Sequence, residues 1–101
     1  MYARIVRFRD VTAEGISEFV GLILEEGPPA GLDETGIQVF FDEANGTAVF
    51  VGYFETEQKM RDASAIFEKM DMSKTPGIRD SIDLCELKLG PSAPWQWRGS
   101  R

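Results

Sequence analysis

Few side chains in this sequence are equipped for acid–base or metal chemistry. The chain contains no histidine, which is the commonest general base near neutral pH and the commonest zinc and haem ligand. Its single cysteine, Cys85, therefore has no histidine to activate it, and it lies in an apolar segment where a thiol behaves as a small hydrophobic group. We interpret Cys85 as a packing residue and not as a nucleophile.

The acidic residues show no pattern of metal ligands. Adjacent pairs such as Glu25-Glu26 lie at the expected ends of helices and in loops, where neighbouring side chains point apart and are solvated. Asp10 begins a segment that resembles a calcium loop, but Gly21 occupies the twelfth position, where a glutamate is needed. The glycines follow neither the dinucleotide-binding nor the phosphate-loop spacing. We therefore predict no metal and no cofactor, and we assign no catalytic residue.

Two polar side chains in β-prone segments are candidates for contacting a ligand. Arg4 offers a fixed guanidinium group and Tyr53 a phenol, which suit a small aromatic or anionic molecule. The alternative is that Tyr53 is a packing residue with its hydroxyl satisfied. Arg4, together with Arg7 and Arg9, would then be a solvated flank of a strand.

The composition indicates one folded domain. The chain has 101 residues and a mass of 11.3 kDa, with 43% hydrophobic and 28% charged residues, enough apolar matter for one packed core. We expect a single domain over residues 1–101, with its core at 2–89 and a C-terminal tail at 90–101. In the tail, Trp95 and Trp97 either pack on the core, dock on a neighbouring subunit or close a pocket.

The charge pattern argues against nucleic acid and membranes as partners. A net charge of −6 and a pI near 4.6 leave no cluster of Lys and Arg for neutralising phosphates. Arginines interrupt the apolar residues of segment 1–10, so this segment lacks the continuous apolar run of a signal peptide or membrane span. A lone cysteine agrees with a reducing compartment, and we expect a cytoplasmic protein.

The first half of the chain predicts a strand followed by a helix. Tyr2–Phe8 is a short β-prone run, and Thr12 is suited to cap a helix that follows it. Gly27-Pro28-Pro29 ends this helix, because proline lacks a backbone donor. The expected apolar stripe of the helix consists of Ile16, Phe19, Val20, Ile23 and Leu24.

The second half predicts a hairpin, a helix and a last strand. Ile37–Asp42 and Ala48–Phe54 are β-rich runs joined through Asn45-Gly46, a pair suited to a type I′ turn. Thr56 is the expected cap of a helix that ends near Asp71, and Ile82–Leu89 is the expected last strand. The expected inner face of this helix consists of Met60, Ala63, Ser64, Phe67 and Met70.

The element order predicts the fold class. Strand, helix, strand, strand, helix, strand is the βαββαβ order of an α+β, ferredoxin-like fold, with an antiparallel four-stranded sheet and two helices on one face. With this order, the chain resembles the dimeric α/β-barrel superfamily over Tyr2–Leu89, particularly the small antibiotic-biosynthesis-monooxygenase-like proteins. The resemblance rests on the opening Met1–Phe8, the Asn45-Gly46 hairpin leading into Val49–Val51, and Thr75–Arg79 before the last strand.

The resemblance implies a range of activities. Proteins of this superfamily include cofactor-free oxygenases of polycyclic aromatic compounds, lactone isomerases, proteins of no known activity and haem-degrading enzymes, which use an axial histidine that this chain lacks. We expect a homodimer that binds a small apolar or aromatic molecule without catalysis. The alternative is a cofactor-independent monooxygenase of phenolic or polyketide-like aromatic compounds.

The strands also predict where a ligand and a second subunit lie. The bulky groups of the two helices predict an apolar pocket between helices and sheet, and a solid core is the alternative. Phe40 beside Phe41, and the run Val49–Val51, make both faces of the sheet apolar. The helices cover one face, so we expect a homodimer through the other, with Phe41 and Val51 on that uncovered face.

Overall fold

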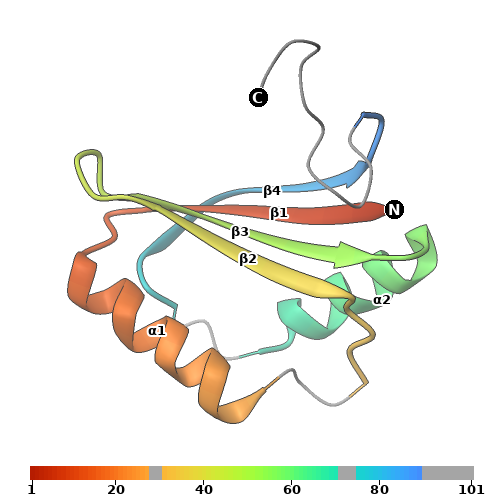
Figure 1. Cartoon of the computed structure of the whole chain (residues 1–101), viewed down its shortest axis with the longest axis horizontal. Coiled ribbons are helices and arrows are strands. Elements are labelled where there is room, and N and C mark those ends of the chain that lie inside the picture. Colours follow the sequence, from red (N-terminus) through yellow and green to blue (C-terminus); the bar gives the residue numbers. More distant parts are fainter. Residues whose placement is uncertain (28–30, 71–74, 90–101) are drawn as a thin grey trace, which may run out of the picture.

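The computed structural model describes residues 1–27, 31–70 and 75–89 and shows a ferredoxin-like α+β fold. Two helices lie on one side of an antiparallel four-stranded sheet with the strand order β2-β3-β1-β4 (Figure 1). This confirms the expected fold class, whereas the tail with Trp95 and Trp97 lies outside the described residues. The elements are β1 (Tyr2–Arg9), α1 (Ala13–Glu26), β2 (Gly36–Asp42), β3 (Thr47–Phe54), α2 (Glu57–Glu68) and β4 (Ile78–Glu86).

The two helices begin where their capping residues predict. Thr12 accepts a hydrogen bond from the amide of Gly15 at 3.0 Å, and Thr56 accepts one from the amide of Lys59 at 3.1 Å. α2 ends at Glu68, before the expected end near Asp71. Within the described ranges, neither helix is long and apolar enough to cross a membrane.

The central strands divide their side chains between two faces of the sheet. In β3, Ala48, Phe50 and Phe54 are buried under the helices, whereas Val49 and Val51 alternate with them and are half-buried on the other face. We call this other side the open face, because no helix of the described chain covers it (Figure 1). Val51 lies on the open face as expected.

The expectation for Phe41 was wrong. Phe41 pairs with the buried Ala48 and packs against the core beneath the helices, whereas Phe40 pairs with Val49 on the open face and is 54% exposed. Residues directly opposite each other in antiparallel strands point to the same side, so pairing register decides which phenylalanine is buried. The sequence alone does not fix this register.

The interior consists of two separate hydrophobic clusters. The α1 cluster is built on Val6, Phe8, Val11, Ile16, Ala48 and Phe50, and the rings of Phe8 and Phe19 each lie 5.2 Å from the ring of Phe50. The α2 cluster is built on Phe54, Met60 and Ala63, with Phe67 packed against it. Leu24 was wrongly expected to be in the stripe of α1, since it is 80% exposed.

β4 begins earlier than the sequence predicts. It spans Ile78–Glu86 and not Ile82–Leu89, because Phe8 pairs with Arg79 and Arg9 with Ile78 beyond a register shift at Arg7/Phe8. Pairing with β1 therefore brings into β4 polar residues whose types are not typical of strands. Leu89, which the sequence placed in the strand, is 71% exposed.

The β2–β3 hairpin is confirmed, but its turn differs from the expected type. A type I′ turn needs positive φ at both central residues, and of the pair Asn45-Gly46 only Gly46 has it, at 65°. Asp42 holds the turn by accepting hydrogen bonds from the backbone amide of Asn45 at 3.2 Å and from its side chain at 2.7 Å. This Asx-type contact fixes Asn45 without a left-handed backbone.

Candidate functional site

Arg4 is buried in the interior of the protein. It lies on the helix-facing side of β1 and is 8% exposed, whereas Arg7 and Arg9 are exposed. Alternation explains this placement, because Arg4, Val6 and Phe8 point to the same side of the strand. The interpretation of Arg4 as part of a solvated flank was therefore wrong.

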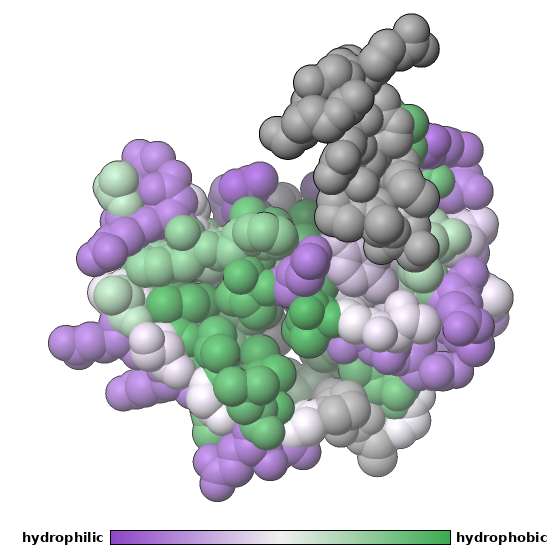
Figure 2. Space-filling model, in the orientation of Figure 1, coloured by the Kyte–Doolittle hydropathy of each residue, from purple (hydrophilic) through white to green (hydrophobic). Residues whose placement is uncertain are grey.

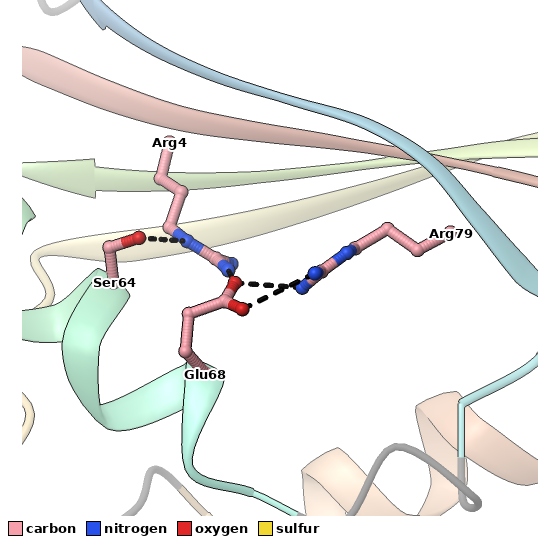
Figure 3. Close-up of polar contacts among 4 residues, drawn as sticks. All are labelled: Arg4, Ser64, Glu68 and Arg79. Atoms are coloured by element: carbon pink, nitrogen blue, oxygen red, sulfur yellow. Dashed lines mark hydrogen bonds and ion pairs between the residues drawn. The ribbon is translucent and has the colours of Figure 1, made fainter.

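Three residues of α2 hold the Arg4 guanidinium in place. Its Nε donates a hydrogen bond to Ser64 Oγ at 3.2 Å, and its Nη2 forms an ion pair with Glu68 Oε1 at 3.5 Å (Figure 3). The guanidinium carbon lies 4.6 Å from the centroid of the Phe67 ring, within the range of a cation–π interaction. One face and two edges of the guanidinium are thus fixed by a single helix.

A second arginine reaches the same carboxylate from the neighbouring strand, β4. Arg79 of β4 donates to both oxygens of Glu68, at 2.7 Å and 3.2 Å, in a bidentate arrangement (Figure 3). Burial lowers the pKa of Arg4, and the positive charge of Arg79 adds to this effect. The negative charges of Glu68 and Glu34 oppose both effects.

Glu34 brings a second carboxylate into the interior. It belongs to the segment between α1 and β2, and a Cβ atom added to Gly52 would collide with its Oε2. Gly52 is the cross-strand neighbour of Arg4, so the missing side chain at Gly52 makes room for the carboxylate beside the guanidinium. Burial raises the pKa of Glu34, and the nearby charge of Arg4 partly offsets that rise.

The segment that carries Glu34 is anchored on both sides. Leu32 packs against the α2 cluster, and Asp33 forms an ion pair with Lys59 of α2 at 2.9 Å. The backbone amide of Thr35 donates to the carbonyl oxygen of Tyr53 at 2.8 Å. These contacts tie the segment to both α2 and β3, so Glu34 is positioned by tertiary contacts.

Arg4 lies in a row of the sheet whose middle is buried and whose two ends are exposed. The row runs across all four strands and consists of Ile37, Gly52, Arg4 and Leu84. Its two ends face the helices, yet Ile37 is 42% exposed and Leu84 is 36% exposed. The neighbouring rows belong to the α1 cluster on one side and the α2 cluster on the other.

We call this row, together with the side chains around Arg4, the Arg4 site. Hydrophobic side chains gather over α1 and β2, and the surface beside them is hollowed (Figure 2). The site combines apolar walls with a few fixed polar groups, which is the usual composition of a small-molecule site. Its polar groups are Arg4, Ser64, Glu68, Arg79 and Glu34.

Tyr53 is not part of the Arg4 site. It lies on the open face, where its hydroxyl donates a hydrogen bond to Gln38 Oε1 at 2.7 Å. Gly52, the residue before Tyr53, pairs with Arg4 and points to the same side of the sheet. Tyr53 therefore points to the side opposite to Arg4. The structure does not bring the two predicted ligand-contacting residues together.

The remaining candidates for chemistry are isolated. Cys85 is half-buried on the open face, opposite Ala3. Within residues 1–27, 31–70 and 75–89, no group of three or more Cys, Asp or Glu side chains is placed to hold a metal ion. The chemistry available at the Arg4 site is therefore hydrogen bonding, ion pairing and proton exchange at its carboxylates.

Sequence reasoning missed three of the five polar groups at this site. Ser64 was expected on the inner face of α2, but no role was assigned to Glu34, Glu68 or Arg79. One signal was available: the period-two alternation of β1 places Arg4 on the same side as Val6 and Phe8. A charged residue on an apolar face needs partners, and this predicts that some exist without naming them.

Comparison with known proteins adds no relative to this picture. Neither a scan against protein-family models nor a search of curated proteins returns a match to the chain. The structure itself defines the class, a ferredoxin-like α+β domain with a buried arginine between its sheet and α2.

Proposed function

We propose that this protein binds a small apolar or aromatic molecule at the Arg4 site, without catalysis. The observation that carries the proposal is the position of Arg4, a nearly buried guanidinium in the one row of the helix-facing side that separates two hydrophobic clusters. The uncovered ends of this row offer apolar surface, and the guanidinium and its partners offer fixed orientation.

The energetics of burial support a binding role for Arg4. Removing a guanidinium from water is expensive, and an apolar side chain of similar volume commonly serves stability as well or better. The stability of the fold therefore does not require an arginine at position 4. A charged group held by Ser64, Glu68 and the Phe67 ring is, however, well suited to contact a polar group on a bound molecule.

A titration of the chain with aromatic probes, followed by amide NMR, tests this proposal. Methylnaphthalene and naphthylmethanol should shift the amides of residues around Arg4, and Phe67→Ala should weaken binding by about tenfold through loss of ring contact. Arg61→Met, on an exposed part of α2, is the matched control and should leave binding unchanged. Shifts that appear only on the open face would contradict the proposal.

We propose that the functional unit is a homodimer formed through the open face. Ile5 lies beside Val51, and Val49 lies beside Phe40, so these two pairs make an apolar patch on this face, and the exposed Arg7 also lies beside Val49. A second copy with the same face closes it by two-fold symmetry, and stable interfaces bury about 800 Å² per partner. The resemblance to the dimeric α/β-barrel superfamily supports the same arrangement.

Sedimentation equilibrium tests the dimer directly. The unmodified chain should return about twice its monomer mass at low micromolar concentration, and Phe40→Asp should shift it toward monomer. Leu24→Asp is the control, because Leu24 is even more exposed but lies on α1, away from the open face. A folded monomer of the unmodified chain would overturn the proposed dimer.

The second candidate function is a cofactor-independent monooxygenase of phenolic or polyketide-like compounds. Glu34 beside Arg4 favours it, because a carboxylate accepts a proton and a guanidinium stabilises the resulting substrate anion. The substrate itself then reduces dioxygen, with one oxygen atom entering the product and the other leaving in water. Dioxygen consumption with an anthrone-type compound, abolished in Glu34→Gln, would establish it over binding alone. The cytoplasmic location stays a prediction.

A further inference from the structure

The charges around Arg4 balance one another. The charged groups that act on Arg4 are Glu68, Arg79 and Glu34, so two guanidinium groups face two carboxylates. Glu68 is already engaged by both arginines, at 3.5 Å from Arg4 and 2.7 Å from Arg79. The site as a whole therefore carries no net charge before any ligand enters.

This balance makes an anionic ligand a poor fit. A carboxylate or phosphate entering beside Arg4 would meet the like charges of Glu34 and Glu68 in a place partly removed from water, where such repulsion is weakly screened. It would also have to compete with Glu68 for the guanidinium groups. An uncharged ligand leaves the balance intact.

Glu34 has hydrogen-bonding capacity to offer such a ligand. Among the described residues, no side chain or backbone group donates a hydrogen bond to its carboxylate. Ser64 and Glu68, in contrast, are both engaged with Arg4. The carboxylate lies over Gly52, in the row that separates the two hydrophobic clusters. A half-buried carboxylate without a donor is a strong acceptor for a hydroxyl or amide group that arrives with a ligand.

We propose that the Arg4 site selects uncharged apolar molecules that carry a hydroxyl or amide donor, and that Glu34 is the residue that determines this selectivity. The inference rests on the small-molecule binding proposed above and names the ligand class. The ligand donor bonds to the Glu34 carboxylate, its apolar body lies against an exposed apolar end of the row, and Arg4 keeps its ion pair with Glu68. The raised pKa of Glu34, caused by burial, fits a carboxylate that water solvates poorly.

Three probes with the same ring system test the selectivity. Methylnaphthalene, naphthylmethanol and naphthoate differ only in a methyl, a hydroxymethyl and a carboxylate group, and calorimetry near neutral pH gives their affinities. The unmodified protein should bind naphthylmethanol about tenfold more tightly than methylnaphthalene, and naphthoate most weakly.

Removing one negative charge from the site should reverse the order. Glu34→Gln leaves two guanidinium groups facing one carboxylate, so naphthoate should become the tightest ligand while methylnaphthalene keeps its affinity. Glu43→Gln removes the same charge from the exposed β2–β3 turn and should leave the order of the three probes unchanged. The amide NMR spectrum of each variant reports whether it is folded.

The outcomes separate the two proposals. If methylnaphthalene and naphthylmethanol bind equally to the unmodified protein, the selectivity is overturned while the binding function stands. If naphthylmethanol keeps its advantage in Glu34→Gln, the role of Glu34 is overturned. If none of the three probes binds, both the selectivity and the binding function fail.

Discussion

Replacing Arg4 with methionine separates a structural arginine from one kept for binding. The substitution removes a cation–π contact with Phe67 worth about 0.5–2 kcal/mol. It also removes the hydrogen bond to Ser64, worth about 0.5–1.5 kcal/mol, and an ion pair with the half-exposed Glu68, worth about 0–1 kcal/mol. Together these losses amount to roughly 1–4.5 kcal/mol.

One gain opposes these losses. The guanidinium no longer has to leave water on folding, a penalty of several kcal/mol for a buried ion, while the methionine side chain replaces an aliphatic stem that Arg4 already buries. Glu68 does not become an unpaired charge, because Arg79 still holds both of its oxygens. We therefore expect Arg4→Met to change the free energy of unfolding by no more than about 1 kcal/mol.

Urea unfolding followed by circular dichroism at fixed protein concentration measures this change. With a slope of roughly 1 kcal/mol per M, the midpoint should move by less than about 1 M, while probe binding at the site falls. Arg61→Met on the exposed side of α2 is the control and should move the midpoint very little. A loss of about 3 kcal/mol or more in Arg4→Met would show that Arg4 is a structural residue and refute the reasoning.

Two further predictions concern a carboxylate and a pair of glycines. Because burial raises the pKa of Glu34, folding favours its protonated form. That contribution is fully present below the pKa of the unfolded chain and is lost as pH rises through the folded pKa. The Glu34→Gln variant should thus have a higher free energy of unfolding than the unmodified chain at neutral pH, and it should lose this advantage in acid. If the free energies of unfolding of the two proteins differ by the same amount at every pH, the prediction is contradicted. Gly77→Ala should lower the melting temperature, by the equivalent of about 1–3 kcal/mol, because its Cβ would collide with the carbonyl oxygen of Arg9 and lie 2.9 Å from Val11 Cγ2. Gly21→Ala, in α1 with nothing within 4 Å of the added atom, should raise it; equal shifts in both variants would show that packing is not the cause.

Local patterns in the sequence determined the elements and their order. Thr12 and Thr56 mark helix starts because a hydroxyl satisfies free backbone amides, and this depends only on residues three positions away. The apolar period of each segment distinguishes helix from strand for the same reason. The ferredoxin-like order follows from such short-range signals, and the structure confirms it.

Pairing between distant strands decided what the local patterns left open. β4 begins at Ile78 because β1 extends far enough to pair with it, and Phe40 faces outward because of its register with Val49. Neither fact is encoded in the residues of one segment, since a strand shifted by one residue exchanges its two faces.

The candidate site depended on tertiary structure most of all. The alternation of β1 places Arg4 on the inner side, but its partners come from α2, from β4 and from the segment before β2. Glu34 reaches Arg4 only because Gly52, on a third strand, has no side chain. Charged residues in helices and loops look alike in a sequence, and only the packing of the two helices on the sheet determines which of them surround a buried arginine.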